Sequence, residues 1–166
     1  MVARYLSRLA TVLAMALWWG GLTFYALFVV PTGVDVLGGE TEQGFITERV
    51  SNIINVCGIV ALVVLLANAA ASWRSIGRLA KSVIAITWLA MAAAQLVLLL
   101  VHPRLDALLD VTSHSITEPS SFHRLHEFYL SVTTVQWSAG LLHFMAVVAI
   151  WCRLPTKLSS QHQPSA

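Results

Sequence analysis

Four long apolar runs dominate this chain and limit what it can fold into. They cover roughly residues 5–30, 46–73, 79–101 and 122–151. Each run is longer than the about 20 residues that a helix needs to cross the hydrocarbon core of a bilayer. The segments between the runs are too short to fold as separate domains. The sequence therefore predicts an all-α fold in which almost the whole chain is one membrane domain.

The composition supports the same fold class. Of the 166 residues, 57% are hydrophobic and only 11% are charged, whereas charged residues make up about 25% of a soluble globular protein. The apolar excess must face lipid. We expect an integral membrane four-helix bundle of antiparallel, up-down helices. The expected helices cover about residues 5–30, 43–73, 79–101 and 122–152, within a transmembrane domain of residues 1–158 followed by a disordered polar tail at 159–166.

The basic residues divide unevenly between the two ends of these helices. Short segments rich in Lys and Arg are retained in the cytoplasm. One side carries most of them, namely Arg4, Arg8, Arg74, Arg78, Lys81, Arg153 and Lys157. All acidic residues fall on the other side or at the helix ends that face it. We therefore expect a multi-pass protein of the cell inner (cytoplasmic) membrane with both termini in the cytoplasm. The small net charge gives no reason to expect a nucleic acid partner.

Polar side chains within the apolar runs carry the most information about function. Such groups are costly in hydrocarbon and tend to face a bundle interior or a watery cavity. They recur at the three- and four-residue spacing that places side chains on one face of a helix. The three stripes are Glu48, Ser51, Asn52 and Asn55; Gln95 and His102; and His126, Tyr129, Thr133, Gln136, Gly140 and His143.

Most of these residues belong to the outer halves of their helices, so the stripes predict one outward-facing polar pocket between the second, third and fourth helices. The candidate ligand-binding residues are Asn52, Asn55, Gln95, Tyr129, Thr133, Gln136 and His143. His143 would be the deepest of them. The alternative is that these side chains only join the helices to one another through hydrogen bonds.

Histidines near the outer ends suggest a second kind of site, because imidazole is a common ligand of transition metals. His102, His123 and His126 are the candidate ligands of a copper or zinc ion. The alternative is that these interfacial positions accommodate His without function. Haem fits less well, because the deep His143 has no evident partner at its own depth. No Ser-His-Asp set, HExxH or phosphate-binding Gly loop occurs, so the sequence names no catalytic residues.

Three segments carry a resemblance to a known group of proteins. The first is Trp18 to Phe24 with Val29-Val30-Pro31, the second is Thr41 to Asn55, and the third is His123 to Trp137. Together they resemble small uncharacterised four-helix bacterial membrane proteins of the domain-of-unknown-function type. That resemblance implies no activity. The first segment is also distantly similar to the first helix of copper-resistance protein D, which implies copper transport, although that family has more helices.

These observations lead to one working hypothesis and two alternatives. The hypothesis is a membrane protein that binds or transports a small solute or metal ion through its outward-facing polar pocket. The alternatives are a non-catalytic structural or assembly subunit of a membrane complex and a redox protein that binds haem or quinone. The expected partner is the lipid bilayer. A homodimer or a membrane-complex partner is also expected, because so small a bundle would not easily enclose a continuous path alone.

Overall fold

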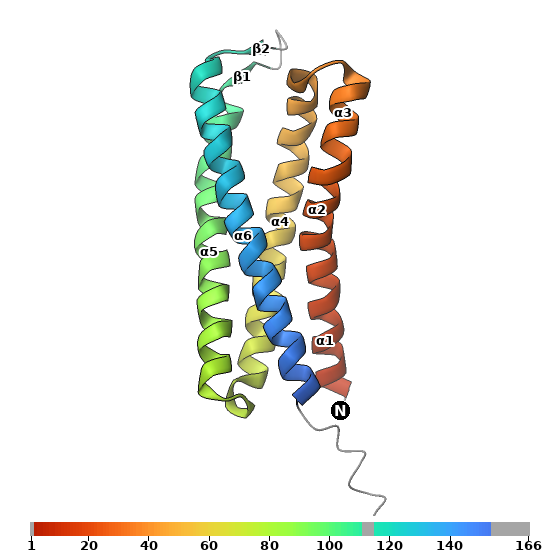
Figure 1. The fold of residues 1–166 in the computed structure, drawn as a ribbon, viewed down its shortest axis with the longest axis vertical. Helices are drawn as coiled ribbons and strands as arrows, with labels where there is room; N and C mark the ends of the chain where they lie inside the picture. The colour runs from red at the N-terminus through yellow and green to blue at the C-terminus, as the bar shows by residue number, and fades with distance from the viewer. Residues whose placement is uncertain (1, 111–114, 154–166) are drawn as a thin grey trace, which may run out of the picture.

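The computed structural model describes residues 2–110 and 115–153, and these residues form a bundle of long helices (Figure 1). Four helices are long and apolar enough to cross a membrane, namely Tyr5–Leu37, Glu40–Ser75, Arg78–Asp106 and Pro119–Cys152. The predicted set of four long apolar helices is confirmed. The tail expected at 159–166 lies outside the described residues.

The first long helix is continuous but irregular. Its parts are α1 (Val2–Met15), η1 (Ala16–Gly20), α2 (Gly21–Phe24), η2 (Tyr25–Val29) and α3 (Val30–Leu37). The η1 and η2 segments are π-helical. Segment η2 lies directly before Pro31, which has no N–H to donate and whose ring crowds the carbonyl four residues earlier. The helix was expected to end near residue 30, yet it continues past the proline to Leu37. Gly38 then ends it with a φ of 82°, a left-handed conformation that favours glycine.

A short turn joins the second and third long helices. Helix α4 (Glu40–Ser72) leads through a short turn, η3 (Trp73–Ser75), into α5 (Arg78–Asp106). Helix α5 was expected to end at residue 101, but it continues past Pro103. His102 is therefore a buried residue within the helix rather than its last residue.

A small hairpin joins α5 to the last helix. Strand β1 (Leu109–Asp110) pairs antiparallel with β2 (Ser115–Ile116), and α6 (Pro119–Arg153) follows. Proline is favoured in the first turn of a helix, because the missing N–H would have no partner there. The hairpin lies at one end of the bundle, and the N-terminus lies at the other (Figure 1). We call these the hairpin end and the N-terminal end.

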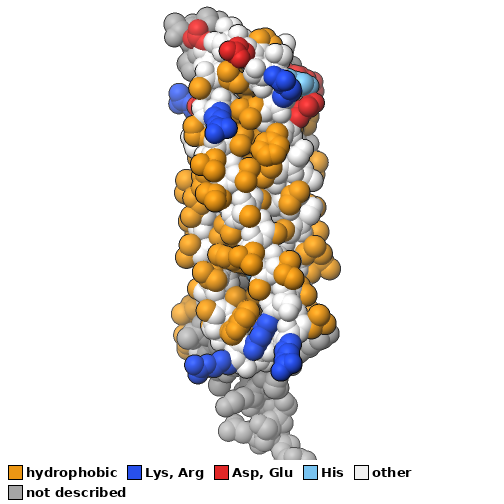
Figure 2. Space-filling model, turned by 90° about the vertical axis from the view of Figure 1, so that its left-hand side faces the viewer, with side chains coloured by type: hydrophobic (Ala, Val, Ile, Leu, Met, Phe, Trp, Pro, Cys, Tyr) orange, Lys and Arg blue, Asp and Glu red, His pale blue; other side chains and the backbone are white. Residues whose placement is uncertain are grey.

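The surface has an apolar middle and charged ends. On the face drawn in Figure 2, hydrophobic side chains cover the central length of the bundle, and the charged side chains gather at its two ends. Many large apolar side chains are exposed at central positions, such as Leu17, Val60 and Leu96. Water would solvate such an apolar belt poorly, whereas the hydrocarbon tails of lipids would solvate it well.

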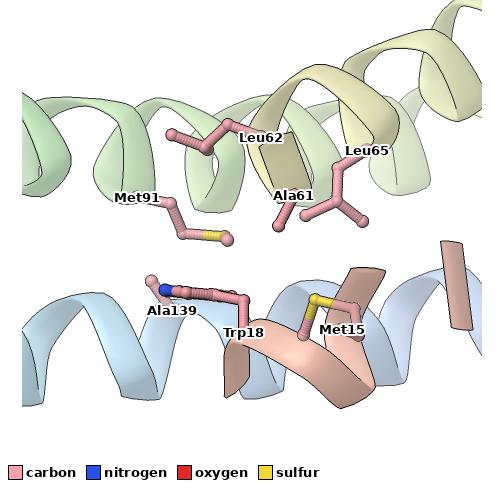
Figure 3. Packing of buried hydrophobic residues seen from close by; sticks show 7 residues of the cluster. All are labelled: Met15, Trp18, Ala61, Leu62, Leu65, Met91 and Ala139. Carbon is pink, nitrogen blue, oxygen red and sulfur yellow. The ribbon is translucent and has the colours of Figure 1, made fainter. Parts of the chain in front are cut away.

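The centre of the bundle is packed with apolar side chains from all four long helices. The main cluster consists of Met15, Trp18, Ala61, Leu62, Leu65, Met91 and Ala139 (Figure 3). Trp18 is its largest member and is only 2% exposed. Two glycines make room for its indole: a Cβ at Gly140 would lie 3.0 Å from a Trp18 ring carbon, and one at Gly58 would lie 3.0 Å from Nε1.

A second tryptophan fastens the first helix to α6. Trp19 Nε1 donates to the carbonyl oxygen of Trp137 at 3.1 Å, and Trp137 Nε1 donates to Thr23 Oγ1 at 2.8 Å. The two indoles stack with their centroids 4.9 Å apart. Both indole N–H groups are thus satisfied inside the bundle.

Candidate functional site

Four polar side chains from three helices form one chain of hydrogen bonds in the hairpin half of the bundle. Gln136 Nε2 donates to Gln95 Oε1 at 2.9 Å, and Gln95 Nε2 donates to Asn55 Oδ1 at 3.1 Å. Asn55 Nδ2 in turn donates to the Tyr129 hydroxyl at 3.2 Å. We call these four residues the amide chain. The sequence selected all four as candidates, and the structure brings them together.

The positions of the amide chain follow from how α5 and α6 pack. Positions later in α5 pair with positions earlier in α6. Gln95 bonds to Gln136, whereas Thr87, which comes earlier in α5, bonds to His143, which comes later in α6. Tyr129 lies two turns before Gln136 on the same face of α6. Asn55 is the α4 residue that reaches both helices, since it bonds to Gln95 and to Tyr129.

The hydrogen-bonded amides are closed off from their surroundings. Asn55, Gln95 and Gln136 are at most 4% exposed. Directly beside Gln95 Oε1 lies Gly58, where an added Cβ would collide with that oxygen and would also crowd Trp18. The amide chain and the apolar cluster therefore meet at Gly58, beside the Trp18 indole.

His102 continues the polar cluster toward the hairpin end. Its Nδ1 lies 2.9 Å from Asp106 Oδ1, one turn later in α5. The imidazole is edge-on to the Tyr129 ring, with centroids 6.1 Å apart. Its other nitrogen, Nε2, is buried and has no hydrogen-bond partner among the described residues. An unpaired buried acceptor costs about 1–3 kcal/mol, so it calls for an explanation.

Two more residues of α4 complete the surroundings of His102. Ser51 lies close to the Tyr129 hydroxyl, and Asp106 is close enough to this residue to interact with it electrostatically. Glu48 lies one turn from Ser51 toward the hairpin end and interacts electrostatically with Asp106. We call His102, Asp106, Tyr129 and Glu48 the His102 site.

A second buried histidine lies nearer the N-terminal end. His143 Nδ1 is 2.9 Å from Thr87 Oγ1, and this hydroxyl also donates to the Val83 carbonyl oxygen at 2.7 Å. His143 Nε2 is buried and, within the described chain, unpartnered. The sequence analysis missed Thr87, although it lies two turns before Gln95 and so extends the same stripe of α5. His143 thus belongs to a separate pair, not to the amide chain.

Two predicted ligand-binding residues do not join the amide chain. Asn52 is exposed on α4, and its side chain has no hydrogen bond among the described residues. It lies three residues before Asn55, which rotates it toward the outer surface of the helix. Thr133 uses its hydroxyl to donate to the Tyr129 carbonyl oxygen at 2.9 Å, within its own helix.

The three candidate metal ligands have separate surroundings. His102 pairs with Asp106, whereas His123 Nε2 lies 3.1 Å from Glu127 Oε1 in an exposed pair. The His126 ring stacks on Phe122 at 5.7 Å. Within residues 2–110 and 115–153, no group of three or more His, Cys, Asp or Glu side chains is arranged to hold a metal ion. The structure therefore gives no support to a three-histidine metal centre.

The cavities found in the structure lie away from the His102 site. An open groove of about 370 Å³ between α5 and α6 is lined by Ile86, Thr87, Ala90, Thr134, Val135, Ser138, Ala139 and Leu142. A much smaller cavity of about 10 Å³ lies near Asn68 and Trp151. Neither is lined by a residue of the amide chain. The three amides and His102 are buried in this conformation, whereas Asp106 is partly exposed.

Fold and site together define a four-helix protein whose helices are suited to a membrane and which holds one cluster of buried, hydrogen-bonded polar residues toward its hairpin end. Comparisons with known proteins add no family: no family model matches the chain, and no curated protein or solved structure matches it either. Function is therefore inferred from the residues themselves.

Proposed function

We propose that this chain is an integral membrane protein that binds a small solute at the His102 site. The solute would enter from the side of the membrane opposite the cytoplasm. The helices would run alternately up and down through the cytoplasmic membrane. Both termini would be cytoplasmic, because seven of the ten basic residues lie toward the N-terminal end or follow α6. The hairpin end, with the His102 site beneath it, would then face outward.

One observation carries the solute-binding proposal. His102 Nε2 is a buried hydrogen-bonding atom that no described protein group satisfies, whereas the amides of Asn55 and Gln95 bond through both their oxygen and their nitrogen. Protein interiors rarely leave such an atom unpaired, and an exception indicates a bound water, an ion or a ligand. Asp106 fixes the orientation of the imidazole, which is how a binding histidine is usually held.

The second candidate function is a structural or assembly subunit, and the amide chain favours it. Each of its amides bonds across helices, so these side chains do stabilise the bundle whether or not a solute binds. Interhelical hydrogen bonds of this kind contribute about 0.6 kcal/mol each on average. The structural function explains Asn55, Gln95 and Gln136, but it leaves His102 Nε2 unexplained.

Thermal unfolding of the detergent-purified protein separates the two functions. The panel of solutes would contain small alcohols, amides, amines and carboxylic acids, together with copper and zinc salts. A solute that binds only the folded state at about 100 times its Kd stabilises that state by about 2.7 kcal/mol. We expect at least one member to raise the Tm of the wild type and not that of His102→Gln.

His123→Gln is the matched control. It also removes a histidine that pairs with a carboxylate four residues later, but that pair is exposed. This variant should respond to solutes as the wild type does. If no member of the panel distinguishes His102→Gln from the other two proteins, the solute site is wrong and the structural function stands.

A further inference from the structure

The chemistry around His102 specifies what kind of solute fits the site. We infer that the solute is a small primary amine in its cationic form, held by His102 and Asp106 and favoured by the charge of the nearby Glu48. This inference rests on the proposed function, since it assigns a ligand class to the same site. Three features specify the ligand: the position of the proton on the imidazole, the negative charge at the hairpin end and the small size of the site.

The imidazole requires a hydrogen-bond donor. Asp106 is a carboxylate and only accepts, so His102 Nδ1 is the donor in their 2.9 Å contact. In a neutral imidazole with its proton on Nδ1, the Nε2 atom carries a lone pair. That atom is the one left unpartnered. A solute with an N–H or O–H group satisfies it, whereas one with only acceptors does not.

The charge around the site requires a cation. Asp106 and Glu48 are close enough to interact. No Lys or Arg forms an ion pair with either of them among the described residues. The wider surroundings have the same sign, because all eight acidic residues of the chain lie toward the hairpin end, with only Arg49, Arg104 and Arg124 beside them. Such an acidic mouth concentrates cations from solution.

An ammonium group meets both requirements at once. One N–H would donate to His102 Nε2, and the positive charge would offset the nearby carboxylates of Asp106 and Glu48. The Tyr129 ring beside His102 adds an aromatic wall of the kind that favours cations. A metal ion fits less well, because these side chains do not form a set of three ligands.

The burial of His102 limits the size of the solute. The cavities described above do not reach His102, and the imidazole is 5% exposed. A solute of two or three non-hydrogen atoms, about the volume of one or two waters at about 30 Å³ each, needs only a small local displacement. Methylammonium is the smallest organic cation with these properties.

Isothermal titration of the detergent-purified protein tests the inference with three probes. Methylammonium offers both charge and N–H donors, tetramethylammonium offers the charge without a donor, and acetamide offers donors without the charge. We expect methylammonium to bind the wild type and the other two to bind at least about tenfold more weakly, which is the effect of losing one charge-assisted hydrogen bond.

Variants locate the binding. Glu48→Gln, which is only half-buried and so should fold, is expected to weaken methylammonium binding by about tenfold, and His102→Gln should abolish it. Glu127→Gln removes an exposed carboxylate at the same end and should leave the affinity unchanged. Equal effects of Glu48→Gln and Glu127→Gln would mean that only the general surface charge matters, and would overturn the assignment.

The outcomes also distinguish this inference from the proposed function. If acetamide, another neutral solute or a copper or zinc ion binds through His102 while methylammonium does not, the amine assignment is wrong and the solute site stands. If no solute in either experiment acts through His102, both are wrong.

Discussion

At the scale of single residues, a buried side-chain amide stabilises the bundle through both its carbonyl oxygen and its NH₂ group. Asn55 accepts from Gln95 and donates to Tyr129, so its removal leaves a donor on one helix and an acceptor on another without partners. Asn52 belongs to the same helix, is exposed and makes no such bonds among the described residues. The two asparagines provide a matched pair that isolates the effect of the amide chain.

We expect Asn55→Leu to lower the free energy of unfolding in detergent by about 1–3 kcal/mol, because buried groups lose their partners. Asn52→Leu should change it by no more than about 0.5 kcal/mol, as is usual for exposed positions. Reversible unfolding in mixed micelles gives both values. Equal losses in the two variants would contradict the hydrogen-bonding pattern described here.

Helical periodicity predicted the amide chain because its members recur at steps of three, four and seven residues. It did not exclude Asn52, because a position about 60° from Asn55 around the helix still falls within a broad polar stripe. Nor did it predict that Asp106 would hold His102. That pairing depends on α5 continuing through Pro103, and a proline usually marks the end of a helix.

At the scale of single helices, close packing between two helices depends on glycine at the point of contact. Gly58 on α4 faces Trp18 and the Gln95 side chain, and a Cβ there would collide with Gln95 Oε1. Gly44 on the same helix has no atom within 4 Å of the corresponding position. The same substitution at these two sites should therefore have opposite effects.

Gly58→Ala is expected to destabilise the protein by about 1–3 kcal/mol through overpacking. Gly44→Ala should stabilise it by about 0.5–1 kcal/mol, because alanine is the better helix former. Unfolding of the two variants under the conditions used for the asparagine pair measures both signs. If Gly58→Ala proves neutral or stabilising, Trp18 does not pack as described.

The helices themselves were predictable in number and type, but their ends were not. Long apolar runs indicated four helices, which is the strongest signal a sequence of this kind contains. The first helix runs on to Leu37 and the third to Asp106, past Pro31 and Pro103 respectively. A π-helical segment before Pro31 is a local adjustment of the hydrogen bonds that apolar periodicity does not reveal.

For the whole molecule, the central expectation is the orientation in the membrane. Single cysteines in a cysteine-free background would report it by reaction with a membrane-impermeant maleimide. Thr117→Cys, between the hairpin and α6, should react in intact cells. Ser75→Cys, in the turn between α4 and α5, should react only after permeabilisation. The reverse pattern would place the His102 site toward the cytoplasm.

Of the overall arrangement, the sequence predicted the four helices from the apolar runs and an orientation from the charged residues at their ends. Convergence of the polar stripes was predicted, but the choice between an outward-facing pocket and hydrogen bonds between the helices was left open. Side-chain amides can bond to water in a vestibule or to one another in a packed core. The distances between the helices decide whether the amides bond to water or to one another. The periodicity of the sequence carries no information about those distances.

Nitrogen-15 NMR of the histidine side chains tests the solute site most directly. The chain has six histidines, and His102→Gln identifies the resonances of His102. Without solute, Nε2 of His102 should have the shift of an unprotonated nitrogen. Methylammonium should move that resonance and leave His123 unchanged, and tetramethylammonium should move neither. A protonated Nε2 would contradict the amine assignment, and an Nε2 that no solute in the panel affects would contradict a solute site at His102.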